Sequence, residues 1–507
     1  MKTIPSLITT VLLLFSPLLA LAQTDKQVWV QRFGGATPSA VAVDSSGNII
    51  VTGGGDDYAT IKYSPSGVPL WTNYYDSPVH LVDAASALAV ASNGNIFVTG
   101  FSYSHDGEDV LPEYLTIAYT GEGVPLWTNR ANEGAPVAIA AGGNGDVIVT
   151  GSYDVVLGDG VWVTIKYSGA GVPLWTNRYG GSASFAHSLA VDSHGDSVVV
   201  GSSNQKFAAI KYSSSGSTLW TSVYSRNAPD YDDPDGLATA VGVWTNGEIF
   251  VTGYAVREPI AEGSEYDFVT IKYSASGLPV WTNLYGAEKI GDFAQSLAVD
   301  GSGNVVVTGF SQNNASNYLR NFVIIKYSND GIPLWTNLYA GPGDPRDTPH
   351  AVAVDRNGNV FVTGSSFQTH PGDSITIAYS SEGVPLWTNR YHGPAGHYDG
   401  GYDLAVTGVG EVVVLGYSFG DYATIKYDSG FALDPPRLSV NGIVMSDNNL
   451  ILAWPTNFSG FNLESTTNMT PPVTWSEVTN ARVIVGGQFT VTNSRSASAQ
   501  IFRLHKP

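Results

Sequence analysis

The sequence contains no cysteine, which excludes disulfides, thiolate metal sites, iron–sulfur clusters and cysteine nucleophiles. Charged side chains are scarce, at 13% of 507 residues, and 24 Lys and Arg against 44 Asp and Glu leave a net charge of −20. This charge repels phosphates and anionic headgroups, so nucleic acid is not an expected partner. Instead the chain is rich in Gly (57), Pro (27), Tyr (27), Phe (19) and Trp (12). This composition predicts an all-β protein of short strands and tight turns.

The N-terminus has the pattern of an export signal. Lys2 precedes an apolar run from Val11 to Leu21, and Ala20-Leu21-Ala22 provides the small-x-small site that signal peptidase recognises. The run is shorter than the roughly 20 residues that a membrane span needs. The sequence therefore predicts a cleaved signal peptide over residues 1–22, no membrane span after cleavage, and a secreted protein that is periplasmic, on the cell surface or extracellular.

A phrase of 13 residues recurs through most of the chain. VAVDSSGNIIVTG begins at Val41, and related phrases begin at Leu88, Ile139, Leu189, Val241, Leu297, Val352 and Leu404. Each is followed by an Ile-Lys-Tyr or Ile-Ala-Tyr phrase, and the first seven units continue with a phrase such as SPSGVPLWTN. A period near 50 residues is typical of propellers and solenoids.

Each repeat predicts four short strands, a to d, joined by Gly-containing turns, as in a propeller blade. Pro69 and its counterparts stand two residues before the Trp of strand d, which favours the outer edge for that strand because Pro cannot donate to a ladder. The eighth unit has no Trp phrase after Tyr427, whereas residues 29–35 match that phrase. We therefore predict an eight-bladed β-propeller over residues 28–430, closed by the N-terminal strand.

The phrases AVDSSGN, VTG, DYATIKYSPSG and PLWTN resemble the bacterial β-propeller repeats of the SBBP type, over about residues 28–430. That resemblance implies an exported protein and seven blades, whereas this sequence has eight units. The chain is also similar to eight-bladed quinoprotein repeats. Their cofactor pocket uses a vicinal Cys pair that is absent here, so no quinone cofactor is expected.

The connections between strands b and c, and between strand d and the next strand a, vary in length, whereas those on the other face are nearly constant. Variable loops on a rigid scaffold are where binding usually resides. Four acids in these d–a segments stand five residues before the first apolar residue of strand a: Asp83, Asp292, Asp347 and Asp399. Ring symmetry would bring them toward one end of the channel, as a candidate Ca²⁺ site. The alternative is that each caps its own turn. His350, His392 and His397 are further candidate ligands.

Residues 431–436 form the predicted linker, and 437–507 contain short apolar runs separated by turn residues. This segment resembles the small immunoglobulin-like or fibronectin-like sandwiches appended to exported bacterial proteins.

No residue pattern supports catalysis, so the sequence predicts a monomeric, exported binding or scaffold protein that engages an extracellular glycan, protein or cation on its variable loop face. The alternatives are a carboxylate-dependent extracellular carbohydrate-active enzyme and a purely structural cell-surface component.

Overall fold

The structure, a computed structural model, describes residues 26–55, 57–103, 112–153, 160–181, 183–226, 236–260, 263–286, 291–312, 319–341, 346–367, 372–394, 397–430, 439–444, 449–455, 462–467, 475–485, 488–494 and 501–505. The predicted signal peptide and the linker at 431–436 lie outside these residues. Within the described ranges the chain forms strands and turns, and none of them forms a helix able to cross a membrane.

Up to residue 427 the strands follow one another in meanders of four, which we call blades. The first strands of the blades are β2 (Ala36–Val43), β6 (Ala84–Val90), β10 (Ala135–Ala141), β14 (Phe185–Val191), β18 (Gly236–Val243), β22 (Gly291–Val299), β26 (Thr348–Val354) and β30 (Asp399–Val406). The second strands are β3 (Ile49–Gly55), β7 (Ile96–Ser102), β11 (Val147–Tyr153), β15 (Ser197–Ser203), β19 (Ile249–Ile260), β23 (Val305–Gln312), β27 (Val360–Ser366) and β31 (Val412–Ser418).

The third strands are β4 (Tyr58–Tyr63), β8 (Glu113–Tyr119), β12 (Val161–Tyr167), β16 (Lys206–Tyr212), β20 (Gly263–Tyr273), β24 (Arg320–Tyr327), β28 (Asp373–Tyr379) and β32 (Asp421–Tyr427). The fourth strands are β5 (Pro69–Tyr75), β9 (Pro125–Ala131), β13 (Pro173–Tyr179), β17 (Thr218–Tyr224), β21 (Pro279–Tyr285), β25 (Pro333–Tyr339) and β29 (Pro385–Tyr391). β1 (Gln27–Gly34) pairs antiparallel with β32, in the order β1-β32-β31-β30.

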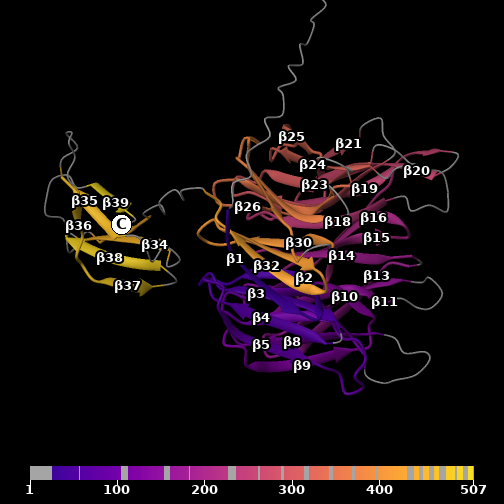
Figure 1. Cartoon of the computed structure of the whole chain (residues 1–507), viewed down its shortest axis with the longest axis horizontal. Coiled ribbons are helices and arrows are strands. Elements are labelled where there is room, and N and C mark those ends of the chain that lie inside the picture. Colours follow the sequence, from indigo (N-terminus) through magenta and orange to yellow (C-terminus); the bar gives the residue numbers. More distant parts are fainter. Residues whose placement is uncertain are drawn as a thin grey trace, which may run out of the picture.

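The blades are arranged around an axis. Each first strand contacts the first strand of the next blade, and β30 contacts β2. Figure 1 shows the result: the indigo β1 lies beside the orange strands from the other end of the repeats. The fourth strands lie at the sheet edges, and most begin at a proline, as the sequence predicted.

Neighbouring blades are held together by a side-chain pattern that repeats with the phrases. The indole Nε1 of Trp71 donates to Gly121 O in the next blade at 3.1 Å, and Lys62 Nζ donates to the same carbonyl at 2.9 Å. Lys62 also pairs with Asp44 of its own blade, 2.9 Å away. Between these contacts, apolar side chains from facing blades form the buried core. The strand-c lysines and the tryptophans are therefore part of the scaffold.

The strands after residue 438 form two smaller sheets, drawn in yellow in Figure 1. One has the order β33-β34-β38-β37 and the other β36-β35-β39. Their bounds are Ser439–Val444 (β33), Asn449–Pro455 (β34), Asn462–Thr466 (β35), Ser476–Glu477 (β36), Arg482–Val485 (β37), Gln488–Ser494 (β38) and Ile501–His505 (β39). The segment from Val483 to Thr492 lies in two paired strands, β37 and β38.

Candidate functional site

Every first strand contains a β-bulge at the same place. The register between the first and second strands shifts by one residue, for example between Pro38 and Ala40. Bulges re-aim a side chain and are frequent next to binding sites. The extra residues of the bulges are Ser39, Ser86, Val137, His187, Thr239, Gln295, His350 and Tyr402.

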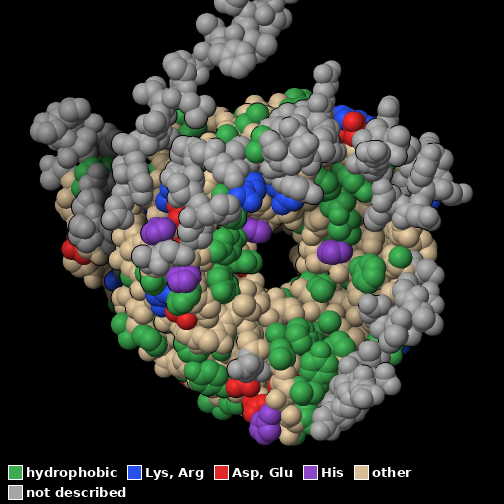
Figure 2. All heavy atoms as spheres, turned by 45° about the vertical axis from the view of Figure 1, so that its right-hand side comes forward, with side chains coloured by type: hydrophobic (Ala, Val, Ile, Leu, Met, Phe, Trp, Pro, Cys, Tyr) green, Lys and Arg blue, Asp and Glu red, His purple; other side chains and the backbone are tan. Residues whose placement is uncertain are grey.

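These bulge residues vary in chemistry while the strands that carry them remain alike. Val137 and Tyr402 are each 39% exposed, although their strands are covered on the outside by the rest of the blade. His350 stacks on Tyr402 with ring centroids 5.3 Å apart, and its burial lowers its pKa to about 4. Figure 2 shows an opening through the ring with histidine side chains beside it. The bulge residues therefore give the inner surface of the ring a mixed polar and aromatic character.

Asp403 adds a carboxylate at the inner strands. Its Oδ2 accepts a hydrogen bond from Val41 N at 2.8 Å, which links β30 to β2, and its Oδ1 accepts one from Leu404 N at 2.9 Å. Burial raises the pKa of Asp403 to about 6 despite these two bonds. Sequence reasoning missed Asp403; the signal was an acid at a position that is Ala or Ser in the other units.

The four predicted aspartates are all buried, each at or next to the start of a first strand, where the connection from the preceding blade ends; we call this connection the blade join. Three accept a backbone N–H from six residues earlier: Asp83 from Ser77 at 2.6 Å, Asp347 from Gly341 at 2.6 Å and Asp399 from Gly393 at 2.7 Å. Burial raises the pKa of Asp347. Asp292 contributes to the negative charge around Arg257. The predicted turn-capping contact is thus present at Asp83, Asp347 and Asp399.

Potential metal ligands gather at two equivalent blade joins. One cluster contains Asp57, Asp76 and Asp83, and the other contains Asp373, His392 and Asp399. Within the described residues, neither cluster contains more than one of the four predicted aspartates. Among the described residues, His392 is the one candidate histidine that belongs to a cluster; His350 stacks on Tyr402, and His397 stacks on Phe419. Sequence reasoning missed Asp373, since nothing in the linear pattern pairs the start of strand c with the end of strand d.

A further surface feature lies where the blade of β18–β21 meets the next. The β19 and β20 strands are 12 and 11 residues long, against seven in most blades, and project as a long hairpin. Beside its base, four rings form what we call the aromatic cluster: Tyr254, Tyr266, Phe293 and Phe310. Successive ring centroids are 5.4, 5.2 and 5.1 Å apart. The guanidinium of Arg320 lies 4.5 Å from the Phe310 centroid.

The aromatic cluster is only partly covered. Tyr254, Tyr266 and Phe293 are half-buried, whereas Phe310 is buried beneath them. Half-exposed aromatic rings present apolar faces together with a hydroxyl, a combination enriched at binding surfaces. The cluster lies at the ends of strands b and c, on the side of the b–c and d–a connections. In the sequence, the aromatic cluster was indicated only by the length of the b–c connection in the fifth repeat unit.

The fold and the repeated blade architecture define a β-propeller. Residues 335–366 match the model of the SBBP beta-propeller repeat family, so the resemblance inferred from the recurring phrases is confirmed. An uncharacterized WD repeat-containing protein, L264, of Acanthamoeba polyphaga mimivirus is 27% identical over 228 residues, which cover 36% of this chain and 16% of that protein. The chain thus matches only a small part of this curated relative.

Two solved structures are similar to this chain. Sqt1 from Chaetomium thermophilum is similar with a TM-score of 0.53 at 11% identity, covering 81% of this chain and all of that one. The Dos1 propeller has a TM-score of 0.49 at 9% identity, covering 79% of this chain and 94% of that one. At this identity the similarity to Sqt1 shows the fold alone.

Proposed function

We propose that the chain is an eight-bladed propeller, closed by its N-terminal strand, that acts as an exported binding or scaffold protein. The face that carries the b–c and d–a connections engages an extracellular glycan or protein. Closure by β1 would leave the last blade without an open edge for other chains to pair with. The C-terminal sheets would form an appended β-sandwich of the immunoglobulin or fibronectin kind.

The aromatic cluster is the observation that carries this proposal. Its rings lie on the variable face, next to the longest hairpin of the propeller, and three of them are half-exposed. Tyrosine supplies a large rigid contact area at low entropic cost, and its hydroxyl can bond to a polar ligand. Arg320 adds a cation beside the cluster on a chain that is otherwise strongly acidic.

The experiment is a glycan array and a panel of extracellular matrix proteins, probed with the purified chain lacking residues 1–22. We expect saturable binding of the chain to at least one glycan or matrix protein. The Tyr266→Ala variant should bind that ligand at least tenfold more weakly, on the order of the loss of one interface hot spot. Tyr74→Ala is the matched control, because Tyr74 is 63% exposed on the outer strand β5. Its binding should equal that of the wild type.

Three results would contradict the proposal. Equal binding by the wild type and Tyr266→Ala would remove the aromatic cluster as the binding surface. Release of reducing sugar from the array glycans would instead support the carbohydrate-active enzyme, and concentration-dependent self-assembly without any bound probe would support a structural component.

A further inference from the structure

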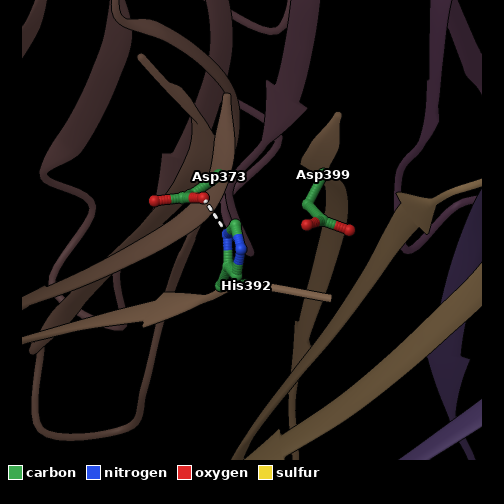
Figure 3. A group of neighbouring side chains, drawn as sticks. All are labelled: Asp373, His392 and Asp399. Atoms are coloured by element: carbon green, nitrogen blue, oxygen red, sulfur yellow. Dashed lines mark hydrogen bonds and ion pairs between the residues drawn. The ribbon is translucent and has the colours of Figure 1, made fainter. Parts of the chain in front are cut away.

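Three potential ligands converge from separate strands at the join between the last two blades. Asp373 opens β28, His392 directly follows β29, and Asp399 opens β30. One ligand atom from each lies within 4.8 Å of the other two. Figure 3 shows the Asp399 carboxylate facing the His392 ring from one side while Asp373 bonds to it from the other.

The backbone fixes the position of the Asp399 carboxylate. Asp399 N donates to Gly372 O at 2.8 Å, which ties the start of β30 to the residue before Asp373. The Oδ2 of Asp399 accepts the Gly393 N–H at 2.7 Å, directly after His392. The site is thus held together without needing a bound ligand, as a preorganised binding site must be.

One carboxylate oxygen at this site has no partner within the protein. Asp399 is 1% exposed, and its Oδ1 is buried without a hydrogen bond. A buried acceptor left unsatisfied costs free energy, and a carboxylate costs more than a neutral group. A cation bound here would remove that cost. The Oδ1 atoms of Asp83 and Asp347 are also buried without a hydrogen bond, so the neighbouring imidazole and carboxylate are what distinguish the Asp399 oxygen as a candidate ligand.

The remaining two groups are reachable from solvent. The His392 side chain is 57% exposed, and its Nδ1 lies 2.8 Å from Asp373 Oδ1. Arg390 Nη1 lies 3.6 Å from the other oxygen of Asp373, which leaves Oδ1 facing the imidazole.

We propose that Asp373, His392 and Asp399 form a binding site for a divalent transition-metal ion, with Zn²⁺ as the best match. One imidazole nitrogen and two carboxylate oxygens are a Zn²⁺ donor set, with a water as the fourth ligand. Ca²⁺ takes oxygen ligands only and would leave the imidazole unused. The site is separate from the aromatic cluster and would cross-link two neighbouring blades.

The chain's own repeats provide an internal comparison. The same three positions at the join between the first two blades are occupied by Asp57, Asp76 and Asp83, and they cluster in the same way. Asp76 stands where His392 stands, so the three ligands of that cluster are all carboxylates; the imidazole of His80 lies outside the three, hydrogen-bonded through Nδ1 to Asp76 Oδ2. A histidine among the three ligands themselves therefore distinguishes the Asp373 site and sets its expected preference for Zn²⁺ over Ca²⁺.

The test is calorimetric titration of the full mature chain with Zn²⁺ and, separately, with Ca²⁺. The wild type should bind one more Zn²⁺ per chain than His392→Ala, a change at an exposed side chain that leaves the fold intact. Asp373→Asn and Asp399→Asn should each weaken this site at least 10-fold, and up to about 100-fold. Zn²⁺ should also raise the melting temperature of the wild type more than that of His392→Ala.

Asp347→Asn is the matched control. Asp347 is equally buried and accepts a backbone N–H at 2.6 Å in an equivalent join, yet it belongs to neither cluster. It should keep the full Zn²⁺ stoichiometry even if it lowers stability. Equal Zn²⁺ stoichiometry and affinity in the wild type and His392→Ala would overturn the proposal. So would a Ca²⁺ affinity that falls as much as the Zn²⁺ affinity in His392→Ala.

Discussion

The indole of Trp71 lies against Gly123 of the next blade so closely that a Cβ on this glycine would stand 2.7 Å from Trp71 Cδ2. Gly123 has a φ of +83°, and its N–H closes the turn to Thr120 O at 3.0 Å. The same contact recurs from blade to blade, for example between Trp127 and Gly171. The glycine of each c–d turn therefore serves both the turn and the junction between blades.

Gly123→Ala should be strongly destabilising. The new methyl group forces a left-handed backbone on Ala and collides with the indole, at a combined cost of about 2–4 kcal/mol. Gly94→Ala is the control, because Gly94 has a φ of +86° with nothing within 4 Å of the added Cβ. It should cost only about 1–2 kcal/mol. Urea unfolding measures both, and equal losses would show that the indole contact contributes nothing.

Lys62→Ala should be more damaging than the loss of an ordinary surface charge. Lys62 and Asp44 side chains are only 7% and 10% exposed, with their charged atoms 2.9 Å apart. Burial acts to raise the pKa of Asp44, but hydrogen bonds from Lys62 and Asn48 outweigh it and keep this pKa below its usual value. Removing one partner of a buried pair costs about 3–5 kcal/mol because the other charge is left behind.

The double variant Lys62→Ala with Asp44→Ala should recover part of that loss. In the second blade the positions equivalent to Lys62 and Asp44 are apolar: Ala118 and Ala91 occupy them in one buried cluster. A double-mutant cycle by chemical unfolding measures the coupling. Additive losses would mean that the pair carries no coupling energy.

Asp403, which lies on the inner strand β30, should make the free energy of unfolding depend on pH. Its pKa is about 6 in the folded protein, above the ordinary value of 3.8, so the folded state holds a proton that the unfolded chain has released. The resulting stabilisation is complete below pH 3.8 and is lost as the pH rises through about 6. A shift of about two units corresponds to at most about 3 kcal/mol.

Asp403→Asn isolates this effect, because Asn cannot ionise. The free energy of unfolding of the variant, relative to the wild type, should increase by up to about 3 kcal/mol between pH 3.5 and pH 7.5. Comparing the two proteins at each pH cancels the titration of every other group. A difference that stays constant over this range would show that Asp403 ionises normally.

Local patterns were enough to predict the blade. The Gly of the SSGN-like and SPSG-like phrases have positive φ in the structure, at Gly47 and Gly67 among others, because hairpin turns need this conformation. Pro69 stands at the start of the outer strand because it has no N–H to donate. Each of these features depends on residues close together in the sequence.

The site residues could not be predicted in the same way. Asp373 and Asp399 come together only because a d–a join folds back onto the start of strand c, and no periodicity encodes that approach. The bulges displace Tyr402 and its counterparts by a register shift that depends on pairing with the next strand. The four aspartates were found by their common register, and for Asp83, Asp347 and Asp399 that register reflects contacts with their own turns.

The pairing of β1 with β32 has a consequence for synthesis. Arg32 Nη2 donates to Ser418 O at 2.9 Å across 386 residues of chain, so β1 leaves the ribosome long before its partner exists. Contacts this distant in sequence form slowly, because the chain entropy of bringing them together must be overcome first. The nascent β1 must not pair with other strands until the last repeat has been made. The β1–β32 pairing is therefore the step of folding at which misassembly is most expected.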